Sequence, residues 1–247
     1  MTAAKTPRSR PALPSGAKRK PDTVADRRTG ARTNARTTAT APAVPYHHGD
    51  LHAALLAAAE AIVEADGPDG LTLRAAARAA GVSHAAPKNH FGDLTGLLSE
   101  LAAVGFHRFA QELADAGRRP QPVASPEASF DAIGSAYVGF AHAHRGLFLL
   151  MFRSDRLDAN RPALRGALDE AAAVLAAGVA NRIGSEPATA HAPSPAQGAA
   201  MLRAWSLVHG FSMLLIDGRL DPILARMPPG TDWQTLLASA LSAPPAR

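Results

Sequence analysis

The stretch from Thr72 to Phe91 constrains the fold most, because its residues follow the pattern of two short helices joined by a tight turn. The Thr72 hydroxyl is suited to cap the first helix. Small or apolar side chains then recur at helical spacing, at Leu73, Ala76, Ala77 and Ala80. Because most of these side chains are small, we expect another helix to cross this one closely.

The turn that follows is specified residue by residue. Gly81 supplies the left-handed conformation that ends a helix at little cost, Val82 is an apolar plug inside the bend, and Ser83 is a good starting residue for the next helix. If Ser83 is the cap, Pro87 lacks the N–H that would donate to the Ser83 carbonyl, and one helical hydrogen bond is lost. If His84 is the cap, Pro87 lies in the first turn, where backbone N–H groups have no partner within the helix. We favour the second register. The pattern predicts a helix-turn-helix, whose second helix enters the major groove of DNA.

At these residues the chain resembles the tetracycline-repressor-like (TetR/AcrR) transcriptional regulators. The resemblance is carried by Leu73-Arg74, by Gly81-Val82-Ser83, and by His90-Phe91-x-Asp93 leading into Leu97-Leu98. Tyr46-His47-His48-Gly49-Asp50-Leu51 resembles the opening of one subgroup of that family. Trp205-Ser-Leu-Val-His209-Gly210 resembles the Trp-x-x-x-His-Gly signature of that subgroup's C-terminal ligand-sensing domain.

The resemblance implies a ligand-responsive regulator, most often a repressor, that binds a palindromic double-stranded DNA operator as a homodimer and is released by a small apolar effector. The residues expected to contact DNA are Thr72, Arg74, Ser83, His84, Ala85, Lys88, Asn89 and His90. Two positions depart from the family pattern, since Lys88 stands where an aromatic residue is usual and Leu94 where Lys is usual. We expect Lys88 to keep a phosphate contact without stacking, and Leu94 to lose one contact.

Positive charge is concentrated at the N-terminus. Residues 1–45 contain ten Lys and Arg against two Asp, a net charge of +8, whereas the whole chain carries +5. Because this segment has almost no large apolar groups, we expect a disordered basic tail. It is either an arm that adds phosphate contacts or an extension with no role beyond solubility. A nonspecific nucleic-acid-binding protein acting through this tail is the alternative function.

Other functions receive less support from the sequence. Cysteine is absent from it, which excludes disulfides and fits a reducing cytosol. No apolar run reaches the roughly 18 residues that span a bilayer, so we expect a soluble, cytoplasmic protein without membrane contact. A metal site is suggested by His47, His48, Asp50 and His52. Because Gly49 interrupts their spacing and no further ligand follows at zinc-like spacing, we expect no metal and no cofactor.

Helical periodicity continues to the C-terminus, and no segment alternates as a strand does. We expect an all-α protein of nine helices, with a disordered tail at 1–45, a three-helix helix-turn-helix domain at 46–93, and a helical effector-binding and dimerisation domain at 94–247. Asp50 and Asp93 are expected to cap the first helix and a long helix that runs to about residue 116. Ser125 is expected to cap the next helix, and capping-box patterns begin at Ser194 and Thr231.

The C-terminal part contains no catalytic motif that we recognise, neither a Gly-x-Ser-x-Gly elbow nor a phosphate-binding Gly loop, so we expect no enzymatic activity. Aromatic side chains recur on its helices instead, where each fills a core or lines an apolar pocket. The residues expected at an effector pocket are Phe106, Tyr137, Phe140, Phe148, Phe152, Trp205 and His209. The polar groups expected to orient a ligand come from Tyr137, His142, Trp205 or His209.

Overall fold

The computed structural model describes residues 51–123, 125–184 and 193–242, and every regular element within these ranges is a helix. The expected all-α fold is confirmed. The basic tail, the Asp50 cap and His47 and His48 of the suggested metal cluster lie outside the described residues. The elements are α1 (Leu51–Asp66), η1 (Pro68–Gly70), α2 (Leu73–Ala79), α3 (Ala86–Phe91), α4 (Leu94–Arg118), α5 (Pro126–Ala143), α6 (Arg145–Met151), η2 (Ser154–Arg156), α7 (Pro162–Ile183), α8 (Pro195–Ile216), α9 (Asp221–Leu224) and α10 (Trp233–Ser242).

Three α-helices precede α4, and the middle one packs against the other two. The buried face of α1 consists of Leu55, Ala59 and Val63. In α2 the buried residues are Ala76 and Ala77, and α2 contacts both α1 and α3. Small side chains at this crossing therefore allow the close approach that the spacing predicts.

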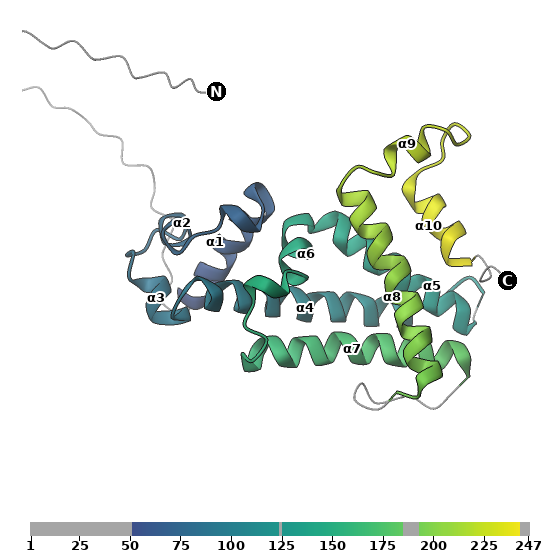
Figure 1. Ribbon diagram of the computed structural model, residues 1–247, viewed down its shortest axis with the longest axis horizontal. Coiled ribbons are helices and arrows are strands. Elements are labelled where there is room, and N and C mark those ends of the chain that lie inside the picture. Colours follow the sequence, from purple (N-terminus) through teal and green to yellow (C-terminus); the bar gives the residue numbers. More distant parts are fainter. Residues whose placement is uncertain (1–50, 124, 185–192, 243–247) are drawn as a thin grey trace, which may run out of the picture. The chain divides into compact units, whose positions relative to one another are not determined.

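The long helix α4 joins these helices to the rest of the chain. Its first turn is capped as expected, since the Asp93 carboxylate accepts a hydrogen bond of 2.8 Å from the Gly96 amide. The helix ends at Arg118, close to the expected end. It contacts α1, α3, α5, α6 and α7, and α4 and α7 run side by side in Figure 1. A single core of buried side chains follows α4 along its length.

The helices that follow α4 begin mostly where the sequence predicts. Ser125 caps α5, and Ser194 opens α8 with a complete capping box closed by Gln197. The cap of α10 is different, because the Asp232 carboxylate accepts from the Thr235 amide at 2.8 Å while the Thr231 hydroxyl donates to the Pro228 carbonyl. The expectation of a capping box beginning at Thr231 was wrong.

The number of helices was also underestimated. The described residues form ten α-helices and two short 3₁₀ turns, whereas nine helices were expected. The additional helix is α9, which spans only Asp221–Leu224 and buries none of its residues. Such a short helix has too few residues to show an apolar period, so the pattern of the sequence does not reveal it.

The helix α8 is unusual in its composition. It is the one helix among the described residues that is long and apolar enough to cross a membrane, which our sequence analysis did not single out. Length and composition alone are weak grounds for a membrane span, since core helices of soluble proteins pass the same test. Several large apolar side chains of α8 are nevertheless exposed, namely those of Leu202, Trp205, Leu207 and Leu214.

Candidate nucleic-acid interface and effector cavity

The turn between α2 and α3 is stabilised by the hydrogen bonds of a Schellman motif. The Val82 amide donates to the Ala77 carbonyl at 3.0 Å, and the Gly81 amide donates to the Arg78 carbonyl at 3.2 Å. Gly81 has a φ of +68°, the left-handed value expected for it. The Thr72 hydroxyl accepts from the Ala75 amide at 3.0 Å and caps α2 as predicted. The local chemistry of the sequence therefore specifies how α2 ends.

The second helix of the pair begins later than expected. Its N-cap is Ala85, which makes no side-chain capping bond, rather than Ser83 or His84. Pro87 still lies in the first turn, where the absence of its N–H costs no helical hydrogen bond. Ser83 instead closes the turn with its carbonyl, which accepts from the Ala86 amide at 3.0 Å. The physical reason for favouring a late start was correct, but the cap residue was wrong.

The eight residues expected to contact DNA all have exposed side chains. Ala85, Lys88 and Asn89 share one face of α3 because they are three and four residues apart. The opposite face is buried through Ala86, Pro87 and Phe91. The other five members of the set are Thr72, Arg74, Ser83, His84 and His90. Leu94, which stands where the family usually has Lys, is half-buried and packs against the core instead.

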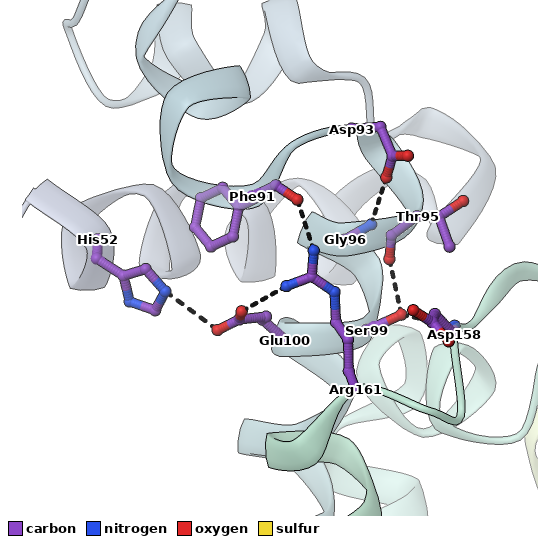
Figure 2. A network of polar contacts seen from close by, with 9 residues as sticks. All are labelled: His52, Phe91, Asp93, Thr95, Gly96, Ser99, Glu100, Asp158 and Arg161. Carbon is purple, nitrogen blue, oxygen red and sulfur yellow. Dashed lines mark hydrogen bonds and ion pairs between the residues drawn. The ribbon is translucent and has the colours of Figure 1, made fainter.

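One arginine connects the end of α3 with α4 and α7 (Figure 2). Arg161 precedes α7, and its guanidinium donates to the Phe91 carbonyl at 2.6 Å and to the Glu100 carboxylate at 2.7 Å. The second oxygen of Glu100 lies 3.1 Å from Nε2 of His52 on α1. The guanidinium thereby joins the beginning of α7 to α3 and α4, and Glu100 extends the network to α1.

The close fit of this guanidinium depends on a glycine. A Cβ atom at Gly96 would lie 2.0 Å from the Phe91 carbonyl oxygen and 2.4 Å from Nη2 of Arg161. Beside it, the buried Ser99 hydroxyl accepts from the Asp158 amide at 2.8 Å and donates to the Thr95 carbonyl at 2.7 Å. The loop before α7 is thus attached to the first turns of α4 by both side-chain and backbone groups.

A second junction joins α1 to α6. The Glu64 carboxylate accepts from the Gly146 and Leu147 amides, both at 3.0 Å, and so caps the N-terminus of α6. Arg145 donates to the Ile216 carbonyl at the end of α8. Helix α6 therefore contacts the helix-turn-helix region at its first turn and is tied to α8 at the same end.

A cavity of about 1050 Å³ lies among α4, α5, α7 and α8. Its lining is mostly apolar, and one face of α7 supplies a continuous stripe. The α7 residues in this stripe are Leu164, Leu168, Ala171, Leu175, Val179 and Arg182. These residues were not among those expected at the pocket, although their spacing of three and four residues along an alanine-rich helix is the signal that could have identified them.

Four of the seven residues expected at the pocket line this cavity, namely Phe106, Tyr137, Phe152 and Trp205. The other three, Phe140, Phe148 and His209, are not among the lining residues. Phe140 and Phe148 are fully buried and pack edge-to-face against neighbouring aromatic rings. His142 packs on Trp233, with the ring centres 5.3 Å apart, and does not line the cavity either.

Three of the aromatic residues form a hydrogen-bonded chain at the cavity wall. The Trp205 indole donates to the Tyr137 hydroxyl oxygen at 3.1 Å, and that hydroxyl lies 3.0 Å from Nδ1 of His209. Burial lowers the pKa of His209 and raises the pKa of Tyr137. Both rings are therefore neutral at pH 7. Since the indole only donates, the Tyr137 hydroxyl keeps its own hydrogen to donate to Nδ1 in the tautomer of neutral His209 that carries its proton on Nε2.

Within the described ranges, no group of three or more His, Asp or Glu side chains is placed to hold a metal ion. His52, the described member of the suggested metal cluster, contacts Glu100 and the Phe91 ring instead. This placement gives His52 a structural partner in the helix-turn-helix region.

Known proteins match both the C-terminal domain and most of the length of this chain. Residues 130–237 match the family described as the tetracyclin repressor-like, C-terminal domain. A solved structure of a protein with unknown function from Rhodococcus sp. RHA1 is 36% identical, with a TM-score of 0.63 over 80% of this chain and 94% of that one. No match to a curated protein was found.

Two more distant structures show the same fold. A putative regulatory protein is 20% identical, with a TM-score of 0.57 over 78% of this chain and 95% of that one. A putative tetR family transcription regulator from Shewanella sp. PV-4 is 17% identical, with a TM-score of 0.52 over 76% and 94%. The chain therefore belongs to the same family as the Rhodococcus protein and has a tetracycline-repressor-like fold. Its residues 130–237 match the tetracyclin repressor-like C-terminal domain.

Proposed function

We propose that the protein is a cytoplasmic, ligand-responsive transcriptional regulator that represses by binding a palindromic operator as a homodimer. The observation that carries this proposal is the Arg161 link, because it joins the end of the proposed recognition helix α3 to α7, whose apolar face lines the cavity. The domain boundaries at 45/46 and 93/94 and membership of the Trp-x-x-x-His-Gly subgroup are parts of the same proposal.

The exposed face of α3 has the chemistry of direct base readout. The Asn89 amide is suited to a bidentate contact with adenine, Lys88 to guanine or phosphate, and Ala85 to a thymine methyl group. We expect Thr72, Arg74 and Ser83 to contact phosphates, which orient the protein without reading sequence, and His84 to face the groove. His90 also packs near His52, with the ring centres 6.2 Å apart, so it contributes to packing as well as to the exposed surface.

The partner surface that we propose for the second copy is an exposed face of α8. Leu207 and Leu214 are 39% and 41% exposed, and Gly210 lies between them at the same helical face with no atom near its Cβ position. A glycine flanked by leucines allows a second helix to approach closely. A two-fold axis there would make the interface self-complementary, as closed dimers require.

In this proposal the protein has two arrangements, one that fits DNA and one that does not. An effector releases DNA because it binds more tightly to the cavity of the arrangement that does not fit DNA. A coupling free energy of about 1 to 3 kcal/mol would change DNA affinity roughly 5-fold to 150-fold, and DNA would weaken the effector by the same factor. Displacement of α7 by a ligand would pull Arg161 away from the Phe91 carbonyl. The orientation of α3 would then change without any direct contact between ligand and DNA.

The test begins with selection of a binding duplex from a random pool, using the full chain. On the selected duplex, Asn89→Ala should lower discrimination against single-base changes by about 1 to 3 kcal/mol, whereas Arg74→Ala should weaken cognate and scrambled duplexes alike. An equal loss on both duplexes for Asn89→Ala would contradict a base-reading role for this residue.

The same assay separates this function from nonspecific binding through residues 1–45. If the basic tail alone binds nucleic acid, then Lys88→Ala and Asn89→Ala in the full chain should bind every duplex as the unmodified protein does. A selected duplex whose binding depends on α3 residues would exclude that alternative.

A further inference from the structure

Charge is distributed unevenly over the wall of the cavity. Among its lining residues, which all belong to the described ranges, the only charged side chains are those of Arg182 and Arg203, and no Asp or Glu is present. The remaining polar groups are few, chiefly the hydroxyl of Tyr137 and the indole of Trp205. A cationic ligand therefore finds no carboxylate in this wall, whereas an anionic ligand finds two guanidinium groups.

Arg182 occupies the last turn of α7 and is held loosely by its neighbours. Its guanidinium carbon lies 4.9 Å from the centre of the Phe130 ring, and Nη1 lies 3.8 Å from Oδ1 of Asp131. This separation is too long for a hydrogen bond, and Oδ1 of Asp131 is buried without a hydrogen-bond partner. Burial raises the pKa of Asp131, and the nearby Arg182 guanidinium opposes that rise. The guanidinium donors thus remain suited to an acid group that enters the cavity.

The lining stripe of α7 also has a length. It runs from Leu164 to Arg182, and 18 residues of α-helix rise about 27 Å. Between these ends the stripe is made only of apolar side chains, and aromatic rings of α4 and α5 also line the cavity. A long, apolar cavity that has the Arg182 guanidinium at the end of its α7 stripe matches a ligand with an extended hydrocarbon chain and one acidic head group.

We infer that the effector is an elongated anionic amphiphile of the long-chain carboxylate class, with its acid group on Arg182 and its chain along α7. This inference rests on the proposed effector role of the cavity and specifies the chemistry of the ligand. Arg182 would determine the preference for a negative charge, and the α7 stripe would determine the preference for chain length.

The experiment measures calorimetric binding of three probes to the full chain below their micellar concentrations: dodecanoate, dodecanamide and dodecylamine. Dodecanoate should bind at least ten-fold more tightly than the amide, because a charge-assisted hydrogen bond replaces a neutral one, and the amine should bind most weakly. Shortening the acid to decanoate should weaken binding roughly fifteen-fold, since it removes two methylenes and each buried methylene contributes about four-fold.

Substitution then assigns the preference to one residue. Arg182→Gln should abolish the difference between dodecanoate and dodecanamide, and Arg182→Lys should restore part of it. Arg165→Gln is the matched control, because Arg165 is an exposed arginine of the same helix that does not line the cavity. The comparison of two probes within each variant remains valid even if one variant is less stable than the parent.

Equal or tighter binding of the amide or the amine, or a dodecanoate preference that survives Arg182→Gln, would overturn the inference. Failure of this inference can be distinguished from failure of the proposed function, because the proposed function is tested by DNA binding and the inference by ligand binding. If dodecanoate binds in an Arg182-dependent manner but does not dissociate the selected duplex, the ligand class stands and the release mechanism fails. If the protein binds a selected duplex and another compound releases it, but dodecanoate does not bind, the proposed function stands and the ligand class is wrong.

Discussion

At the scale of single residues, the hydrogen-bonded chain of Trp205, Tyr137 and His209 makes the stability of the cavity wall depend on pH. Burial lowers the pKa of His209, so the unfolded state binds this proton at higher pH than the folded state does. As the pH falls below the ordinary histidine value of about 6.5, the free energy of unfolding should therefore decrease. A protonated Nδ1 would also lose its ability to accept from the Tyr137 hydroxyl.

We expect His209→Gln to remove this contribution, so that the variant loses less stability than the parent between pH 7.5 and pH 5. The measurement is urea-induced unfolding of both proteins across this range. His142→Gln serves as a control, because His142 is an exposed histidine that packs on Trp233 outside the cavity. If the parent and His209→Gln lose stability in parallel, the buried neutral state of His209 is refuted.

At the scale of secondary-structure elements, the contact of α6 with α1 is set by a glycine. A Cβ atom at Gly146 would lie 2.1 Å from the Val63 carbonyl oxygen and 2.8 Å from the Glu64 Cα atom, which are backbone atoms that no rotamer change can move. We expect Gly146→Ala to destabilise the protein by about 2 to 3 kcal/mol through overpacking. The junction through the Glu64 carboxylate should open at the same time, which should also weaken binding to the selected duplex.

The control for this prediction is another helical glycine with the opposite environment. Gly139 lies within α5, and no atom lies within 4 Å of its Cβ position. Gly139→Ala should therefore stabilise the protein by about 0.5 to 1 kcal/mol, because alanine loses less backbone entropy in a helix. Both free energies come from denaturant unfolding, and a similar change for the two substitutions would contradict the assigned role of Gly146.

Some elements of this fold could be predicted from sequence because their signals are local. The caps at Thr72, Asp93 and Ser125 each involve an amide three residues further along the chain, so their chemistry is visible in a short window. The left-handed Gly81 is likewise specified by its own turn. These signals were sufficient for the helix-turn-helix and for the boundaries of most long helices.

Other elements could not be predicted because their partners are distant in sequence. Arg161 and the Phe91 carbonyl are 70 residues apart, and Glu64 caps a helix 82 residues away. No local pattern relates such groups. The start of α3 at Ala86 has no side-chain cap to mark it, and the burial of Phe91 on the core decides where the helix lies. For the same reason, aromatic content alone did not separate Phe140 and Phe148, which fill the core, from Phe152, which lines the cavity.

At the scale of the whole molecule, the exposed apolar face of α8 predicts the oligomeric state. Membrane insertion would bury this face in lipid, whereas a second copy would bury it in protein. We expect a dimer in sedimentation experiments at micromolar concentration without detergent, and we expect the double substitution Leu207→Glu with Leu214→Glu to yield a monomer. Charged side chains would then face each other across the two-fold axis, with no partner to offset their desolvation.

The consequence for DNA follows from geometry. Two recognition helices read half-sites in successive major grooves only if a dimer holds them about 34 to 36 Å apart, or a multiple of that spacing. The double variant should therefore lose most of its affinity for the full palindrome and bind it no better than a single half-site. Val123→Glu is the control, because Val123 is an exposed apolar residue outside α8. A parent protein that is monomeric, or a double variant that remains dimeric, would place the interface elsewhere and leave the exposed face of α8 to another partner.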